Sequence, residues 1–271
     1  MENLVFPLRN LFGRILNFIC LLDHVFSSKK NLITDASSKR LHAHLESLDC
    51  DRNLVVYFSF DGDRSFDTLP SLRSSLDHRF EIVELSNVEK AAPESCFYFS
   101  RSNLGRDLAA QKDFLSILRT IERQFNSVTF INSSMAWSPS RLNHLISSLL
   151  EKESVYFPII SRQPSFHFQS YFIFIPKIHI SSVSDLYKDS FRNWRFKRSV
   201  VYFGEKKLAK NLKHLDVKTQ SVVSEQALVE SNQQFRSNYN PSLFFGLKMY
   251  EAGLFPGIKR VLLATKPFII E

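Results

Sequence analysis

Two polar clusters in the middle of the chain combine residue types that can hold a polar ligand. The first is the loop Asn103-Leu104-Gly105-Arg106-Asp107, in which an amide and a carboxylate flank a glycine and an arginine. The second is Asn132-Ser133-Ser134, which follows the apolar run Val128–Ile131. Amide and carboxylate oxygens accept hydrogen bonds from ligand hydroxyl and N–H groups, and a glycine lets the backbone approach closely. Because open α/β sheets bind ligands just beyond the ends of their strands, we expect both clusters at one edge of a sheet.

The elements that must position these clusters alternate between strand and helix patterns. Apolar, β-rich runs predict strands at Leu54–Phe60, Phe80–Leu85, Cys96–Phe99, Val128–Ile131, Val155–Ile160 and Phe168–Ile175. Helical spacing of apolar residues predicts helices over Leu41–Leu48, Leu69–His78, Leu108–Ile121 and Leu142–Leu150. This order predicts an α/β fold with a Rossmann-type, mostly parallel sheet flanked by helices.

A third polar cluster, Asp61-Gly62-Asp63, follows the first predicted strand. Its two carboxylates stand at a strand tip, where they can bind a ligand. The alternative is a plain polar turn, for which Asp-Gly is a common signal.

Four motifs in order resemble the rhamnan synthesis protein F family, whose members are similar to GT-A glycosyltransferases. They are the loop Asn103–Asp107, the strand tip Asn132–Ser134, the segment Gln169-Ser170-Tyr171-Phe172 and the segment Pro256-Gly257-Ile258-Lys259-Arg260. The resemblance covers roughly Asn53 to Pro267 and implies a GT-A-like domain that takes a sugar from a nucleotide-sugar donor, UDP- or dTDP-linked. The implied acceptor is a growing, lipid-linked bacterial surface polysaccharide, and the implied location is the cytoplasm, at the inner face of the cell membrane.

The resemblance also implies roles for individual residues. The donor nucleotide would be held by Asp61, Asp63, Arg101, Asn103, Gly105, Arg106, Asp107, Asn132, Ser133 and Ser134. The acceptor and the diphosphate would be held by Gln169, Ser170, Lys259 and Arg260. Asp107 can instead cap the helix that follows it.

The strand tip departs from the family, which has Asn-Asp-Ser where this chain has Asn132-Ser133-Ser134. GT-A transferases usually place an Asp-x-Asp here to bind Mg²⁺ or Mn²⁺, and hard cations prefer carboxylate oxygens. Three alternatives follow: basic residues replace the metal, a carboxylate comes from elsewhere, or activity is lost. In the last case the chain is an inactive relative that binds a partner transferase or a glycan.

Two residues are candidates for the base that deprotonates an acceptor hydroxyl. Glu205 precedes a predicted helix from Lys206, whose N-terminus favours a carboxylate; the alternative is a stabilising first-turn residue. His167 has an imidazole pKa suited to proton transfer; the alternative is a packed or solvated histidine.

Composition restricts the classes of partner. The chain has 271 residues, 44% of them hydrophobic, and 35 Lys and Arg against 27 Asp and Glu give a net charge of +8. This favours anionic partners, but no zinc-finger, RNA-recognition or basic-zipper pattern is present, so we expect no nucleic-acid binding. Three scattered cysteines fit a reducing compartment.

The N-terminal residues 1–52 are expected to form an amphipathic helix and a connector ahead of a catalytic domain at 53–271. On a helical wheel one face is apolar, with Leu8, Leu11, Phe12, Ile15, Leu16, Phe18, Ile19 and Leu22. Two alternatives are open: the helix covers the domain core, or it lies on a membrane surface as a peripheral anchor.

Overall fold

The computed structural model describes residues 2–59, 72–74, 76–86, 97–101, 106–132, 139–158, 160–161, 167–168 and 170–222. Side chains are described for these ranges apart from residues 2–13, 97–100, 139–141, 160–161, 167 and 197.

Among the described residues, the centre of the molecule is a sheet of seven strands in the order β3-β2-β1-β4-β8-β5-β9. Their bounds are β1 Asn53–Ser59, β2 Phe80–Ser86, β3 Phe97–Ser100, β4 Ser127–Asn132, β5 Val155–Phe157, β8 Phe172–Pro176 and β9 Thr219–Ser221. β8 is antiparallel to both of its neighbours, whereas the other neighbouring strands pair in parallel. A separate antiparallel pair is formed by β6 (Ile160–Ser161) and β7 (His167–Phe168).

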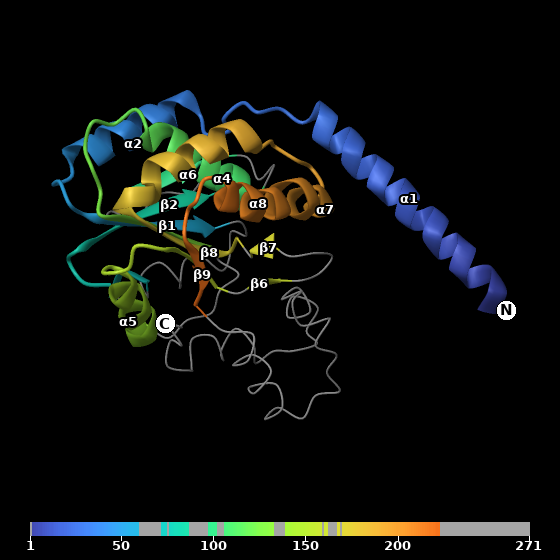
Figure 1. Cartoon of the computed structure of the whole chain (residues 1–271). Coiled ribbons are helices and arrows are strands. Elements are labelled where there is room, and N and C mark those ends of the chain that lie inside the picture. The colour runs from blue at the N-terminus through green and yellow to red at the C-terminus, as the bar shows by residue number, and fades with distance from the viewer. Residues whose placement is uncertain are drawn as a thin grey trace.

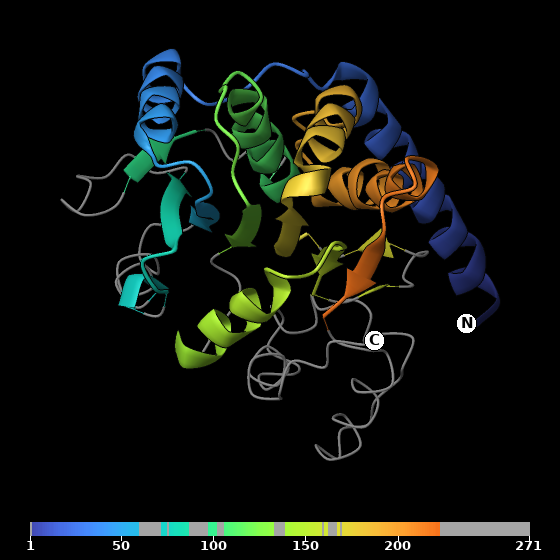
Figure 2. The same cartoon turned by 60° about the vertical axis from the view of Figure 1, so that its left-hand side comes forward.

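Helices cover both faces of the sheet (Figures 1 and 2). One face carries α2 (Asp35–Ser47), α4 (Arg106–Leu118), α6 (Lys177–Ser190) and α8 (Lys206–His214), and the other carries α5 (Pro139–Leu149). Successive residues of a strand point to opposite faces. In β1, Val56 therefore packs in the cluster of α4, and Val55 packs in the cluster of α5. Every residue of β1 is buried, as its continuous apolar run predicts for a parallel strand covered on both sides. The prediction of an α/β fold with a mostly parallel sheet is confirmed.

The core extends across residue 52, the expected limit of the N-terminal segment. Ile33, Leu41 and Leu45 belong to the same buried cluster as the strands. The chain between α1 and α2 is fastened to α4, because Lys112 Nζ donates to the Lys29 carbonyl (2.7 Å) and the Asp113 carboxylate accepts from a backbone N–H of that segment (2.9 Å). The connector is therefore an integral part of the folded body.

Helix α1 (Glu2–Phe26) confirms the predicted N-terminal helix and extends away from the body, as both views show (Figures 1 and 2). In the part of α1 whose side chains are described, Ile15, Phe18 and Leu22 are 48%, 60% and 39% exposed. Of the two alternatives for α1, this part of the helix does not support the one in which it covers the core. Among the helices that the structure describes, none is long and apolar enough to cross a bilayer.

Candidate functional site

The sheet has a topological switch point between β1 and β4. From β1 the chain first adds β2 and β3 on one side, and α4 then returns it to β4 on the other side. Two loops that leave in opposite directions create a crevice beyond the carboxyl ends of such strands, and ligands bind there. Phe58, near the end of β1, pairs with Asn132, the last residue of β4. Asn132, the first residue of the predicted strand tip, thus stands at the switch point.

Asp107 and Asn132 meet at this position. Asn132 Nδ2 donates a 2.7 Å hydrogen bond to Asp107 Oδ2. The Asn132 backbone N–H donates to the Tyr171 carbonyl (3.1 Å), which fixes the end of β4 against the segment before β8. Asn132 is buried and Asp107, in the first turn of α4, is partly exposed. The structure therefore brings together two of the residues predicted to hold a donor.

Arg106 precedes Asp107 and has a backbone φ of 51°. This left-handed conformation is unfavourable for a residue with a Cβ and persists where the surroundings impose it, often at functional sites. The Arg106 side chain is exposed at the start of α4. It is thus an exposed cation at the carboxyl edge, one residue before Asp107.

A second polar network is buried next to this pair. Ser170 Oγ donates to Glu205 Oε1 (2.8 Å), and Gln111 Nε2 donates to the Ser170 carbonyl (2.9 Å). The Tyr187 hydroxyl donates to Gln111 Oε1 (2.8 Å). Since all four side chains are buried, the network holds the Glu205 carboxylate in one orientation. Ser170 and Glu205, predicted to serve the acceptor and the proton transfer, are therefore in direct contact.

Two buried phenols lie close enough to these carboxylates to be affected by their charges. Burial raises the pKa of Tyr187 well above its ordinary value, and the charges of Glu205 and Asp107 raise it further. Burial and the Glu205 charge likewise raise the pKa of Tyr171. The Tyr171 hydroxyl has no hydrogen-bond partner within the described part of the chain. Both phenols are neutral near pH 7, and Tyr187 lies in the field of both predicted carboxylates.

Glu205 does not stand at a helix N-terminus, which corrects the sequence-based expectation. The π-helix η1 (Val200–Glu205) follows α7 (Lys197–Ser199) and continues directly into α8. A carboxylate is favoured at a helix N-terminus because the N–H groups of the first turn are unpaired. The Lys206 N–H is paired, since it donates to the Val201 carbonyl. Single π-turns are frequent at functional sites, and here one ends at the buried Glu205.

Gly204 allows η1 to approach α4 closely. A Cβ at Gly204 would lie 2.5 Å from Leu108 Cδ1 and 3.1 Å from Trp194 Cζ3. Leu108 and Trp194 are fully buried and cannot move aside easily. Because Leu108 directly follows Asp107, the absence of a side chain at Gly204 sets the spacing between Glu205 and the start of α4.

Arg101, predicted to bind the donor, follows β3 at the carboxyl edge, where the charge of Asp107 acts on it. Its side chain is fully buried at the end of β3 and bonds Asp113 through Nε (3.2 Å). Burial lowers the pKa of the Arg101 guanidinium, and the Asp113 charge opposes that shift. The buried ion pair with Asp113 gives this guanidinium a structural role, and its assignment to the donor stays a prediction.

The remaining predicted residues lie outside the described part of the structure. They are Asp61, Asp63, Asn103, Gly105, Ser133, Ser134, Gln169, Lys259 and Arg260. For His167 the backbone is described, in β7, and the side chain is not.

Sequence reasoning missed two residues of these networks and a separate buried carboxylate at the same edge. Gln111 and Tyr187 complete the network around Ser170, and Glu84 is a buried carboxylate of β2 that accepts a hydrogen bond from Ser59 at the end of β1. An acidic residue within the apolar run Phe80–Leu85 was a signal for Glu84. Gln111 and Tyr187 stand in ordinary amphipathic helices, where no pattern distinguishes them.

The donor atoms at the strand tip fit a divalent cation poorly. Hard cations prefer carboxylate oxygens, whereas the tip offers the Asn132 amide and two serines. The carboxylate that contacts Asn132 is that of Asp107, which accepts a hydrogen bond from the Asn132 amide nitrogen. Among the described residues, no group of three or more His, Cys, Asp and Glu side chains could hold a metal ion.

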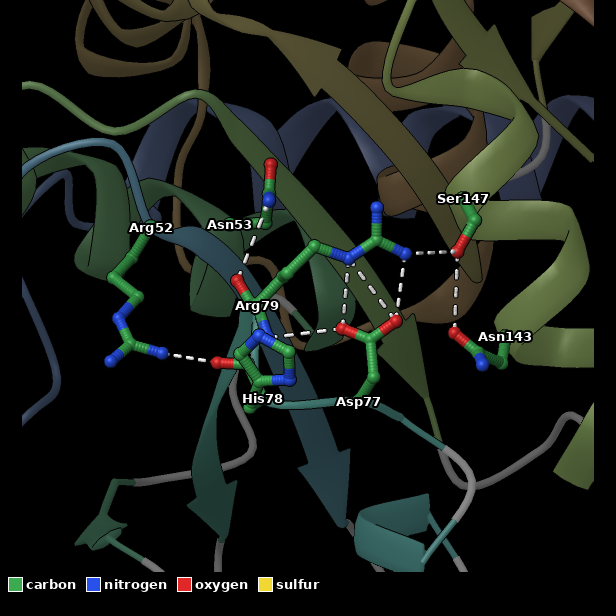
Figure 3. A network of polar contacts seen from close by, with 7 residues as sticks. All are labelled: Arg52, Asn53, Asp77, His78, Arg79, Asn143 and Ser147. Carbon is green, nitrogen blue, oxygen red and sulfur yellow. Dashed lines mark hydrogen bonds and ion pairs between the residues drawn. The ribbon is translucent and has the colours of Figure 1, made fainter.

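An open cavity of about 720 Å³ lies at the opposite edge of the sheet, where β1 and β2 begin and β8 ends. Figure 3 shows the polar network beside it, in which Arg79 Nη2 contacts Asp77 Oδ2 (2.7 Å) and Ser147 Oγ of α5 (3.3 Å). The cavity is lined by both acidic and basic side chains, namely Asp49, Asp51, Glu151, Glu153, Arg52, Arg79, Lys152 and Lys177. Its mixed charge does not favour an anionic ligand, and Arg79 has the structural role of joining β2 to α5. We therefore place the candidate site at the carboxyl edge.

No family model matches the chain, and no curated protein matches it. Solved structures that match include the glycosyltransferase GlyE of Streptococcus pneumoniae TIGR4, at 10% identity and a TM-score of 0.39, over 77% of this chain and 52% of GlyE. The apo form of GlyE matches at 11% identity and a TM-score of 0.36, over 69% of this chain and 51% of GlyE. The chain spans about half of the length of each of these structures.

Proposed function

We propose that this protein transfers a sugar from a nucleotide-sugar donor, UDP- or dTDP-linked, to a hydroxyl of a glycan acceptor. The observation that supports this most is the convergence of four residues predicted from separate motifs. Asp107 contacts Asn132, Ser170 contacts Glu205, and Tyr187 lies in the field of both carboxylates. The convergence occurs at the switch point, where open α/β sheets bind nucleotides.

In this proposal the loop Asn103–Asp107 and the tip Asn132–Ser134 hold the donor. Asp107 and Asn132 accept from ribose hydroxyls or base N–H groups. Arg106, Lys259 and Arg260 neutralise the negative charge of the diphosphate. Cationic side chains are needed for this because the tip Asn132–Ser134 lacks the Asp-x-Asp that would bind a metal ion.

Glu205 is the proposed base. It takes the proton of the acceptor hydroxyl while that oxygen forms a bond to the anomeric carbon, and the bond from this carbon to the diphosphate oxygen breaks with release of the nucleoside diphosphate. The Ser170 hydroxyl orients the carboxylate. His167 is the alternative base, since it belongs to the same acceptor segment.

The proposed acceptor is a growing, lipid-linked bacterial surface polysaccharide, used at the inner face of the cell membrane. This part of the proposal rests on the resemblance of the four motifs to the rhamnan synthesis protein F family.

A second candidate function is that of an inactive relative that binds a partner transferase or a glycan. The replacement of the family's Asp by Ser133 favours it, and so does the closed Asn132–Asp107 pair.

Calorimetric titration with UDP, dTDP, GDP and CMP, each with Mn²⁺ and with EDTA, tests the proposal. We expect micromolar binding of one nucleotide, at least tenfold weaker in Asp107→Ala and unchanged in the control Asp185→Ala, an exposed acid of α6. The EDTA arm shows whether a cation takes part. If none of the four nucleotides binds, the transferase function is excluded. Binding of a nucleotide without sugar transfer from its nucleotide sugars to lipid-linked glycans favours the inactive relative.

A further inference from the structure

The apolar face of α1 points away from the protein. Seven apolar side chains of its described part are exposed: Ile15, Phe18, Ile19, Leu21, Leu22, Val25 and Phe26. At 100° per residue they lie on one side of the helix, opposite Cys20 and Asp23, which are buried. An ordinary surface helix of a globular protein has the reverse orientation, with its apolar stripe on the core.

Polar contacts hold α1 in this orientation. The Asp23 carboxylate accepts from the backbone N–H groups of Arg195 (3.0 Å) and Phe196 (3.2 Å). His24 stacks on the Phe203 ring at 4.2 Å between centroids, and Trp194 Nε1 donates to His24 Nδ1 (3.2 Å). The end of the helix is therefore fixed to the body through specific bonds, and the apolar stripe is left for another surface.

Exposed cations stand beside the stripe. Arg14 is on α1 itself, and Arg198 Nη2 bonds Asn17 Oδ1 of α1 (3.1 Å). Arg195 and Lys207 flank the docked end, where the charge of Lys207 lowers the pKa of His24. None of these four cations forms an ion pair with a carboxylate of the described residues. The apolar side chains Phe196 and Tyr202, 48% and 43% exposed, belong to the same segment.

We propose that α1 and the cations beside it, Arg195, Arg198 and Lys207, bind the surface of an anionic lipid bilayer, with the helix lying in the interface. An amphipathic helix buries its apolar face at the boundary of headgroups and acyl chains, and nearby cations add attraction to anionic lipids. The helix has 25 residues and a length of roughly 37 Å, so it offers an extended line of contact.

The charges favour a bilayer over a second copy of this chain. In a two-fold dimer the same patch meets itself, so that the unpaired arginines and Lys207 would face like charges, which is costly at an interface. A bilayer with anionic headgroups supplies the opposite charge and accepts the apolar stripe at the same time.

The bilayer contact is connected to the candidate site through a short chain of residues. His24 of α1 stacks on Phe203, which is separated from Glu205 by Gly204 alone. A helix lying on the membrane would therefore hold the end of η1, and with it the proposed base, near the headgroups. This consequence rests on the proposed function, whereas the binding of the bilayer does not.

Cosedimentation of the full chain with vesicles tests the proposal. We expect the protein to bind vesicles of phosphatidylcholine that contain about 30% phosphatidylglycerol. Binding should be at least tenfold weaker to vesicles of phosphatidylcholine alone, and at least tenfold weaker in about 0.5 M salt. Phe18→Ser with Leu22→Ser should weaken binding at least tenfold. Arg195→Glu with Arg198→Glu should also weaken vesicle binding at least tenfold, because each cation removed weakens it about fivefold.

Matched controls lie at the opposite edge of the sheet. Ile178→Ser removes an exposed apolar residue, and Lys152→Glu with Lys177→Glu reverses two exposed cations. These variants should bind vesicles like the unchanged protein. Equal binding of all variants, or no binding to anionic vesicles, would overturn the proposal, and sedimentation velocity that shows a dimer broken by the Phe18 and Leu22 substitutions would assign the stripe to self-association. None of these results depends on nucleotide binding, so failure here is distinguishable from failure of the proposed function.

Discussion

The side-chain amide of Asn132, at the end of β4, donates a 2.7 Å hydrogen bond to the carboxylate of Asp107, in the first turn of α4. The two residues are 25 positions apart in the sequence. Their contact joins the two polar clusters that sequence reasoning singled out, and it orients both at the edge of the sheet where a nucleotide is expected to bind.

The Asn132–Asp107 pair should act as a unit in nucleotide binding. Asp107→Ala is expected to weaken binding at least tenfold, Asn132→Ala less, and the double variant by less than the sum of the two free-energy changes, because each single change already breaks the bond. The coupling energy should be about 0.5–3 kcal/mol. Calorimetric dissociation constants of the four proteins measure it. Strict additivity would show that the two side chains contact the nucleotide independently.

Glu205→Gln should lower kcat by about 100-fold or more while the nucleotide dissociation constant changes less than about twofold. The amide keeps the shape and can still accept from Ser170, but it cannot take a proton. The Glu205 carboxylate is identified as the base if Glu205→Gln loses sugar transfer and keeps nucleotide binding. The control Glu151→Gln, at the opposite edge of the sheet, should keep both. Retained turnover in Glu205→Gln would instead transfer this role to His167.

Gly204→Ala should destabilise the protein by about 1–3 kcal/mol, because the added methyl group overlaps the fully buried Leu108 and Trp194. This is the opposite of the usual gain for Ala over Gly in a helix. Urea unfolding measures the change. The double variant Gly204→Ala with Leu108→Ala removes the overlap with Leu108 and leaves the 3.1 Å contact with Trp194, so its loss of stability should be smaller than the sum of the single losses. Additive losses would contradict the close approach of η1 and α4.

Arg101→Met should destabilise the protein by about 3 kcal/mol, the lower end of the range for a broken buried ion pair, because Asp113 loses the guanidinium but keeps Lys112 Nζ at 3.7 Å. The nucleotide dissociation constant of the folded variant should change less than about twofold. Urea unfolding and calorimetry separate the two effects. A loss of nucleotide binding of tenfold or more in a folded Arg101→Met protein would assign this guanidinium to the donor site.

The attachment of α1 should weaken in acid through His24. Burial is the largest cause that lowers the pKa of His24 below its ordinary value of about 6.5, and the charges of Arg192, Lys207 and Lys29 lower it further, while Asp23 opposes them. The unfolded chain therefore binds this proton at higher pH than the folded protein does. The stability that the neutral ring contributes is present above about pH 6.5 and is lost as the pH falls through the lower, folded pKa.

Urea unfolding at pH 5.5 and 7.5 checks this expectation, with His24→Phe as the control that keeps a ring against Phe203. The fall in stability at pH 5.5 should be smaller in His24→Phe than in the unchanged protein. An NMR titration that places the His24 pKa above 6.5 would contradict the lowered value.

The sequence by itself determined the elements of the described core and the polar ends of its strands. Local periodicity marked β1, β2 and β4 as buried strands and α4 as a helix, because side chains that must be buried repeat with the geometry of the backbone. Residue types at the ends of β4 and at the start of α4 marked Asn132 and Asp107, because polar groups just beyond a strand stand where ligands bind.

Only the tertiary structure decided which side chains meet. Arg101 is enclosed by Asp113 from α4, Gln111 and Tyr187 complete the surroundings of Ser170, and η1 places Glu205 inside a continuous helical run. These contacts join segments far apart in the chain, and no local pattern encodes them.

The orientation of α1 was decided in the same way. Its amphipathic pattern is equally compatible with a helix packed on a core and a helix turned outward. Asp23, which bonds the backbone N–H groups of Arg195 and Phe196, fixes the outward orientation, because a buried carboxylate must be hydrogen-bonded and these donors lie on only one side.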